Sequence, residues 1–336
     1  MCTHREERAD KTFLFCQSTA DETELTLGDM VAVGSANLTS GDLIHSRFEV
    51  VSRLGYGSFG TTYQVIDQKT GGLKAIKVLD ESLSQDEGVM GAVSNTLHMV
   101  RINHPNILRI HDVSRGEMAF IEMDYVEGRN LDEVIRQSPD GKLTEAEAIH
   151  YAKEMAQGLA YAHASGITHL DLKPSNVLVA KDQGVTLCDF GVTGKLWFLG
   201  HYLHGGLRRY IAPEVIHGIG VGKTSDIYSF GAVLYEMLTG RPRFSGEDGA
   251  IQTLTEKPLP MEGVSRELSS VVMKCLEKDS KKRFGGFDEV LVALEAVLGI
   301  RKLAEKRSYR NSGRLMSLAL LFVCGALLVG LGVLLR

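Results

Sequence analysis

The stretch His169-Leu170-Asp171-Leu172-Lys173-Pro174-Ser175-Asn176 is the strongest indication of how this chain folds and what it does. It places a carboxylate, an ammonium group and an amide close together in the sequence. Two short apolar runs follow, Val177–Val179 and Val185–Cys188, and both are typical of short strands. Asp189-Phe190-Gly191 comes directly after the second run, and Ala212-Pro213-Glu214 lies further along the chain.

A glycine-rich segment lies upstream between two predicted strands, Phe48–Leu54 and Thr61–Asp67. Its glycines follow the GxGxxG spacing and are Gly55, Gly57 and Gly60. Dinucleotide-binding domains use the same spacing but require a helix directly after the loop. A strand follows here instead. The arrangement therefore favours a flap over a triphosphate, because glycines let backbone N–H groups approach phosphate oxygens.

The next predicted strand, Leu73–Leu79, is mostly apolar and contains Lys77 in Ala75-Ile76-Lys77. A lysine inside an apolar strand is costly unless it meets an anion. Lys77 is therefore a candidate phosphate ligand, and the alternative is a lysine on an edge strand whose ammonium group reaches solvent. Ala119–Tyr125 is predicted to be a further buried strand.

The pattern becomes helical from about Leu131. Thr144–Ala164 carries apolar residues at helical spacing, and Thr144 with Glu147 forms a capping box at its start. Three more helices are predicted at Ser225–Leu238, Leu268–Leu276 and Phe287–Leu298. The fold class is therefore α+β, with a small β-rich lobe followed by a larger helical lobe.

The order and spacing of these motifs resemble the eukaryotic-type (Hanks-type) Ser/Thr protein kinases, and in particular their membrane-anchored bacterial branch. The resemblance covers about residues 48–298. It implies a bilobal protein-kinase fold, with an N-lobe at about 47–125 and a C-lobe at about 126–300. It also implies ATP and Mg²⁺ as cofactors, and transfer of the γ-phosphoryl group of ATP to Ser or Thr of cytoplasmic proteins.

The resemblance assigns roles to the matching residues. Asp171 would orient the acceptor hydroxyl and accept its proton, and Lys173 would stabilise the transferring phosphoryl group. Asn176 and Asp189 would hold magnesium, which prefers such hard oxygen donors. The residues assigned to ATP are Gly55, Gly57, Gly60, Lys77 and the backbone groups of Asp124 and Val126.

Other matching residues are implied to shape the site without taking part in the chemistry. Met123 would be the gatekeeper beside the adenine. Asp226 resembles the family's anchor for the catalytic loop, and Glu214 with Arg283 resembles its buried structural ion pair.

The sequence departs from the family pattern at four positions. Counting back from Pro105 puts Asn95 where the family has the glutamate that pairs with the strand lysine, and an amide lacks the carboxylate's charge assistance. Leu170 replaces the arginine that receives an activation-loop phosphate. Leu207 replaces a threonine associated with Ser/Thr acceptors, which leaves a Tyr acceptor open. Thr62 replaces a valine that covers adenine, a nearly isosteric change.

These departures support an alternative, a tail-anchored pseudokinase that acts as a nucleotide-binding scaffold. Residues 196–204, in the predicted activation loop, are unusually apolar. They either pack on the helical lobe or form a docking surface for a partner. A homodimer or a regulatory partner therefore stays open.

Composition excludes several classes of protein. Lys and Arg number 37 and Asp and Glu 42, and seven of the basic residues but only one acid lie in 301–336, so residues 1–300 carry a net charge of −11. A body this acidic is unsuited to a phosphate backbone, so no nucleic-acid partner is expected. The five cysteines are scattered without a CxxC pair, which indicates neither a disulfide framework nor a zinc site.

The two ends of the chain differ from its body. No signal peptide is predicted, and residues 1–46 are expected to be a polar, loosely ordered leader, or else to include a strand that packs on the following domain. Residues 315–335 carry no charge, and as a helix they would span about 31 Å, against a hydrocarbon core of about 30 Å. The basic segment 301–314 precedes this predicted transmembrane helix. The positive-inside rule then predicts a single-pass, tail-anchored protein of the cell membrane with its kinase domain, residues 47–300, in the cytoplasm.

Overall fold

The computed structural model describes residues 37–57, 60–81, 96–115, 118–190, 209–244 and 249–300. The chain divides into two compact units, Met1–Leu291 and Val292–Arg336. Residues 292–300, the described part of the second unit, are helical. Within the described ranges, no helix is long and apolar enough to cross a membrane. Several predictions fall outside these ranges, namely those for residues 1–36, Asn95, residues 196–204, Leu207 and residues 315–335.

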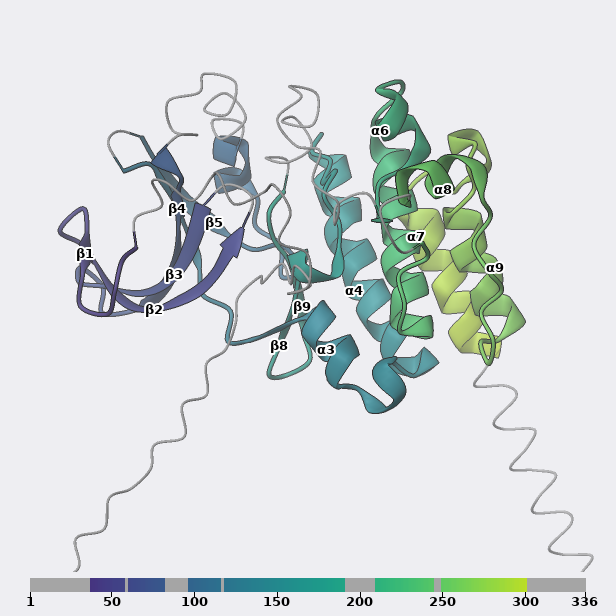
Figure 1. Cartoon of the computed structure of the whole chain (residues 1–336), viewed down its shortest axis with the longest axis horizontal. Coiled ribbons are helices and arrows are strands. Elements are labelled where there is room, and N and C mark those ends of the chain that lie inside the picture. The colour runs from purple at the N-terminus through teal and green to yellow at the C-terminus, as the bar shows by residue number, and fades with distance from the viewer. Residues whose placement is uncertain are drawn as a thin grey trace, which may run out of the picture. The chain divides into compact units, whose positions relative to one another are not determined.

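A six-stranded antiparallel sheet forms the N-terminal lobe of the first unit (Figure 1). Its order is β1-β2-β3-β4-β6-β5. The strands are β1 (Leu43–Ile44), β2 (Phe48–Gly57), β3 (Gly60–Asp67), β4 (Leu73–Leu79), β5 (Ile110–Ser114) and β6 (Phe120–Asp124). β1 lies within the segment for which the sequence left both a loose leader and a strand open, and its Ile44 is fully buried.

Both faces of this sheet bury apolar side chains. Successive residues of a strand point to opposite faces. In β4, Ile76 and Val78 belong to one apolar cluster, whereas Ala75 and Leu79 belong to the other, which also contains Met123. By the same alternation Lys77 points to the face of Ala75 and Met123. The sheet's own pleat therefore aims this lysine toward the second cluster.

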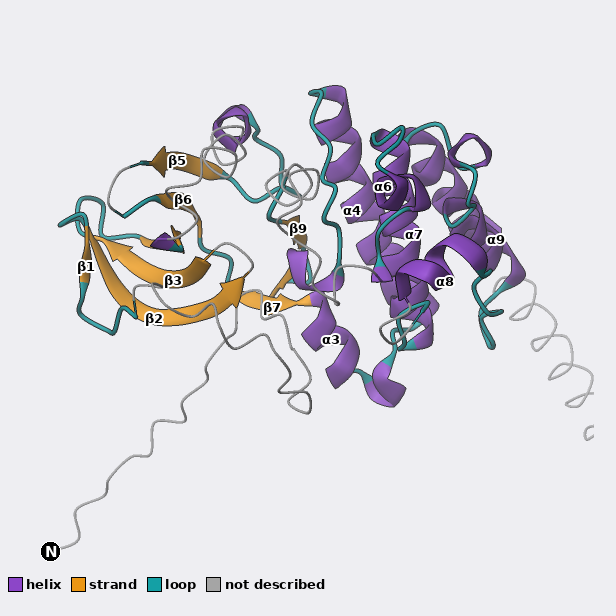
Figure 2. Ribbon diagram, turned by 45° about the horizontal axis from the view of Figure 1, so that its top comes forward, coloured by secondary structure: helices purple, strands orange, loops and turns teal. Residues whose placement is uncertain are grey.

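The C-terminal lobe of the first unit is mostly helical (Figure 2). Its helices are α3 (Leu131–Gln137), α4 (Glu145–Ala164), α6 (Pro213–His217), α7 (Lys223–Thr239), α8 (Gly249–Thr255) and α9 (Arg266–Cys275), and residues 287–291 are also helical. Short 3₁₀ turns are η1 (Thr96–Arg101), η2 (Pro139–Gly141), η3 (Pro174–Asn176) and η5 (Ser280–Lys282). A small antiparallel sheet, β7-β8-β9, consists of β7 (Gly128–Asn130), β8 (Val177–Ala180) and β9 (Val185–Leu187).

Local sequence signals explain where two of these helices lie. The predicted capping box starts α4: Thr144 Oγ1 accepts a hydrogen bond from the Glu147 N–H at 3.3 Å, and Glu147 Oε2 accepts one from the Thr144 N–H at 2.9 Å. α7 is buried along its length from Ser225 to Leu238. A helix that is buried along its length and mostly apolar belongs at the centre of a lobe, as α7 does.

Candidate active site

Asp226, near the start of α7, holds the segment His169–Asn176 in place. The Asp226 side chain is fully buried. Its Oδ2 accepts hydrogen bonds from the His169 N–H at 2.7 Å and from Nε2 of His163 at 2.8 Å, and its Oδ1 accepts one from the Leu170 N–H at 2.7 Å. The backbone φ of Leu170 is 59°, in the left-handed region that costs a residue with a side chain about 1–2 kcal/mol. The bonds to Asp226 stabilise this turn, as predicted for the anchor of the loop.

Three polar side chains of this segment converge on one point. Oδ2 of Asp171 lies 3.1 Å from Nδ2 of Asn176 and 3.3 Å from Nζ of Lys173. The Asn176 amide also donates to the Asp171 carbonyl at 2.8 Å. Oδ1 of Asp171 is buried and has no hydrogen-bond partner among the described residues. Because an unpaired buried oxygen is costly, this atom is placed to accept a hydrogen bond from a bound molecule.

Lys77 extends from the sheet to Asp189. Its Nζ lies 2.9 Å from Oδ2 of Asp189, and its side chain is only 8% exposed. β4 is hydrogen-bonded on both sides, to β3 and to β6. The alternative of a lysine on an edge strand is therefore wrong, and the buried ammonium group does meet an anion. That anion is Asp189, from the Asp189-Phe190-Gly191 motif.

The charges of Lys77 and Lys173 keep Asp189 ionised. Burial raises the pKa of the Asp189 carboxyl, but the charge of Lys77, the hydrogen bond from it and the charge of Lys173 outweigh burial. The pKa therefore lies below its ordinary value, and the group is an anion at neutral pH. The site thus presents two ammonium groups and two carboxyl side chains, those of Asp171 and Asp189, together with the amide of Asn176.

The glycine-rich segment joins β2 and β3 directly, as predicted. The two strands pair as far as Gly57 opposite Gly60, so β2 runs beyond its predicted end at Leu54. A Cβ on Gly60 would lie 1.9 Å from the carbonyl oxygen of Val78, so a side chain cannot fit there. A Cβ on Gly57 would lie 3.7 Å from Nζ of Lys77. The segment therefore lies against the lysine, while Gly55 is buried in the strand before it.

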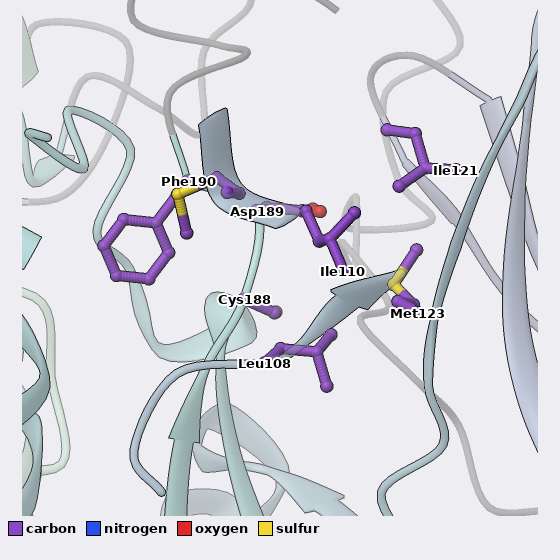
Figure 3. A pocket seen from close by; sticks show the side chains of 8 residues that line it. Leu108, Ile110, Ile121, Met123, Cys188, Asp189 and Phe190 are labelled. Atoms are coloured by element: carbon purple, nitrogen blue, oxygen red, sulfur yellow. The ribbon is translucent and has the colours of Figure 1, made fainter. Parts of the chain in front are cut away.

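An apolar pocket lies beside Asp189. Figure 3 shows Ile121 and Met123 on one side of it and Cys188 and Phe190 on the other. Met123, the predicted gatekeeper, is 4% exposed and lies one residue before Asp124 at the end of β6. The pocket therefore runs from the gatekeeper to the Asp189 motif.

The segment after β6 connects the two lobes. The Asp124 N–H donates to the carbonyl of Arg109 at 3.0 Å. The Val126 side chain packs on the apolar cluster that contains Ala75 and Leu178. Backbone groups at Asp124 and Val126, the predicted adenine ligands, thus lie beside a cluster to which both lobes contribute.

The donor set fits a nucleotide with a magnesium ion. Asn176 and Asp189 offer hard oxygen donors, and Lys77 and Lys173 offer positive charge for phosphates. No group of three or more His, Cys, Asp or Glu side chains in the described ranges is placed to hold a metal ion. Magnesium commonly takes its remaining ligands from phosphates and water, so two protein donors are sufficient.

A family model described as the protein kinase domain matches residues 48–294. The chain belongs to the protein kinase family. The serine/threonine-protein kinase PknB of Mycobacterium tuberculosis (strain H37Rv) is 30% identical to this kinase over 265 residues, which cover 74% of this chain and 42% of PknB. The probable serine/threonine-protein kinase CA_C1728 of Clostridium acetobutylicum is 30% identical over 269 residues, covering 76% of this chain and 41% of that protein.

Solved structures agree with this assignment. The crystal structure of the Mycobacterium tuberculosis PknI kinase domain aligns with a TM-score of 0.63 at 25% identity, and the alignment covers 77% of this chain and 99% of that kinase-domain chain. The predicted bilobal kinase fold of bacterial Ser/Thr type is confirmed. The kinase spans about two fifths of the length of the curated relatives it matches, such as 42% of PknB.

The implied structural ion pair of the kinase is also present. Arg283 donates to Oε1 of Glu214 at 2.6 Å and to Oε2 at 2.8 Å, and the arginine side chain has no exposed surface. Burial raises the pKa of the Glu214 carboxyl, but the hydrogen bond and the charge of Arg283 outweigh it and leave that pKa below its ordinary value. Residues far apart in the sequence are tied together here by a bidentate, charge-assisted contact.

Sequence reasoning missed several residues that line the kinase site. Leu54, Ala75 and Leu178 are buried in the cluster against which Val126 packs. They come from β2, β4 and β8, so no spacing in the sequence connects them. The alternation along β4, which places Ala75 on the face of Lys77, was the one available signal.

Proposed function

We propose that this chain is a membrane-anchored protein kinase that transfers the γ-phosphoryl group of ATP to Ser or Thr hydroxyls of cytoplasmic proteins. The observation that carries the proposal is the convergence of Asp171, Lys173 and Asn176 on one carboxylate oxygen, next to the bond between Lys77 and Asp189. No structural requirement of the fold explains why all five side chains gather there, since buried charges are costly.

Each residue has a physical task in this proposal. Bound ATP and Mg²⁺ supply the transferable phosphoryl group and a divalent charge that offsets the charge of the phosphates. Asp171 orients the acceptor hydroxyl and takes its proton on Oδ1, the atom without a partner. Lys173 stabilises negative charge beside Asp171, and Asn176 with Asp189 holds the cation.

The other side of the site binds and covers the nucleotide. Lys77 contacts the phosphates, and Gly55, Gly57 and Gly60 leave room for backbone N–H groups above them. The backbone at Asp124 and Val126 binds adenine, with Leu54, Ala75 and Leu178 as apolar neighbours of that base. The glycine-rich segment above the phosphates excludes water from the site of phosphoryl transfer.

The test is phosphoryl transfer by the full-length chain in detergent micelles, with Mg²⁺ and a mixture of peptides containing Ser, Thr or Tyr. Asp171→Asn is expected to lower kcat by about 100-fold or more while ATP still binds, since general-base catalysis contributes about 10²–10⁴. Asp140→Asn is the matched control, because Asp140 is exposed and its φ of 62° suits asparagine equally well. Equal transfer by Asp171→Asn would refute the role of Asp171.

The same experiment separates the kinase from the scaffold. ATP binding without transfer by the wild type would support the pseudokinase, which is not favoured, because the relatives named above are Ser/Thr kinases and the five polar residues converge. Phosphoamino-acid analysis of the products then decides between Ser/Thr and Tyr acceptors, the question that Leu207 raises.

The proposed domain organisation follows the sequence. Residues 47–300 form the kinase domain, 301–314 a basic juxtamembrane segment, and 315–335 a transmembrane helix that anchors the chain to the cell membrane with the kinase domain in the cytoplasm. The support is the uncharged length of 315–335 and the basic residues that precede it. The predicted leader is residues 1–46, of which the structure describes 37–46. A second copy or a regulatory protein remains a candidate partner.

A further inference from the structure

Three titratable side chains meet on the surface of the sheet beside the proposed adenine site. Lys74 comes from β4, His111 from β5 and Asp124 from the end of β6. Nε2 of His111 lies 2.6 Å from Nζ of Lys74 and also 2.6 Å from Oδ1 of Asp124, and Lys74 donates to the same oxygen at 3.2 Å. The three strands are therefore connected through one small group of atoms.

A β-bulge brings His111 to this place. Ile110 pairs with Met123 and Asp112 pairs with Glu122, so His111 is the extra residue between two regular pairs. Bulges re-aim a side chain relative to the regular pleat and are frequent next to active sites. This one is opposite the gatekeeper and brings the imidazole to the residue whose backbone is proposed to bind adenine.

The two contacts of the imidazole exclude each other chemically. An unprotonated Nε2 accepts a hydrogen bond from the Lys74 ammonium group, which then bridges His111 and Asp124. In the imidazolium ion both ring nitrogens carry a proton, so Nε2 can only donate, and it donates to Asp124. Two positive groups would then lie 2.6 Å apart, so an imidazolium ion repels Lys74. Protonation therefore replaces a three-strand connection with one between β5 and β6 alone.

Asp124 remains charged throughout this exchange. Burial raises the pKa of its carboxyl, but hydrogen bonds from His111 and Lys74 and the charges of both outweigh burial, so the pKa lies below its ordinary value. The acceptor is thus an anion at neutral pH.

We propose that His111 and Lys74 are positioning residues that clamp Asp124, and that protonation of His111 releases Lys74 and weakens adenine binding. The inference deepens the proposed function and rests on it, because the backbone at Asp124 is proposed there to bind the base. It assigns the kinase a nucleotide affinity that falls in acid.

Other charged groups around His111 have separate partners or are exposed. Asp112, the next residue on β5, accepts a hydrogen bond from the Val113 N–H at 2.8 Å. Arg109, just before β5, is exposed, and its carbonyl accepts from Asp124. η1 also packs against β5, and its two charged or titratable side chains, His98 and Arg101, are exposed.

The test measures the Kd of adenosine for the full-length chain between pH 5.5 and 8.5. Adenosine carries no phosphate that titrates in this range, so it reports on the adenine site alone. For the wild type, Kd is expected to rise about fivefold on acidification, the effect of losing one hydrogen bond. His111→Gln keeps a neutral hydrogen-bonding group that cannot gain a charge, so its Kd should stay at the wild-type alkaline value at every pH.

Two further variants complete the design. Lys74→Met removes the group that protonation displaces, so its Kd should be raised and independent of pH. His150→Gln is the matched control, because His150 is 52% exposed on α4 and has its own carboxylate, Glu154, at 3.8 Å. It should keep the full pH dependence of the wild type.

The outcomes are distinct. A pH-independent Kd for the wild type, or an unchanged pH dependence in His111→Gln, would overturn this inference and leave the proposed function standing. Absence of adenosine binding by all four proteins at every pH would overturn the proposed function, and this inference with it.

Discussion

Glu236 is a buried carboxyl group on α7 whose pKa lies near neutral pH. It is 7% exposed, and its Oε2 accepts a hydrogen bond from the Tyr210 hydroxyl at 2.6 Å. The pKa of Glu236 is raised from its ordinary 4.5 to about 7, mainly by burial and in part by the charge of Asp132. The hydrogen bond from Tyr210 acts in the opposite direction and is outweighed. The folded protein therefore binds a proton here that the unfolded chain releases.

This residue predicts how stability depends on pH. Between about pH 4.5 and 7 the folded state holds the proton and the unfolded state does not, so the free energy of unfolding falls as pH rises, by about 3 kcal/mol in total. Glu236→Gln stays neutral, so its free energy of unfolding should not show this decline. It should exceed that of the wild type most at pH 8. Urea unfolding at several pH values measures this free energy, and Glu262→Gln, at an exposed glutamate, is the control. The same pH dependence of the free energy of unfolding in the wild type and in Glu236→Gln would contradict the prediction.

At the scale of elements, sequence predicted best where one physical signal dominates. β4 has its predicted bounds, Leu73–Leu79, because a run of apolar residues interrupted only by Lys74 and Lys77 is typical of a buried strand. The capping box sets the start of α4. β5 was missed, since His111 and Asp112 interrupt the apolar pattern and a bulge breaks the period of two. Helices as short as α3 and α8 are stabilised mainly by packing, which sequence periodicity does not reveal.

The contact between α7 and the catalytic loop makes the second prediction. Asp226→Asn replaces one acceptor oxygen with an NH₂ group that faces a backbone N–H, so it loses a hydrogen bond and adds a donor clash. We expect kcat to fall at least about tenfold and the free energy of unfolding to fall by about 2–4 kcal/mol. Asp288→Asn, at an exposed aspartate, is the control. A variant with normal kcat would show that α7 does not position the loop.

At the scale of the whole molecule, the proposed anchor predicts where the chain is found. The full-length chain should remain with membranes after a carbonate wash, whereas a chain that ends at residue 314 should be released and keep its kinase activity. A third chain, ending at residue 300, also lacks the basic segment 301–314. Comparing it with the chain that ends at 314 measures what the basic segment contributes, which is expected to be a salt-sensitive attraction to anionic lipids. Release of the full-length chain by the wash would contradict the anchor.

The sequence predicted which residues form the candidate site but not which contacts they make with one another. The motif residues were named from a family resemblance. The structure adds that Lys77 bonds to Asp189 and that a buried oxygen of Asp171 has no hydrogen-bond partner in the part of the chain that the structure describes. These contacts depend on how the two lobes meet, which no spacing in the sequence expresses. The Lys74–His111–Asp124 group was missed because its members lie on three different strands of one sheet, and a bulge brings His111 to the other two.

The left-handed turn at Leu170 links the formation of the catalytic loop to the docking of α7. The amide protons of His169 and Leu170 are both bonded to Asp226, a residue on α7. Both protons are protected while these bonds hold, so the two amides should show the same free energy of opening, that of the α7 contact. Isotope labelling at these two positions would thus time the assembly of the active site during refolding, independently of any bound nucleotide.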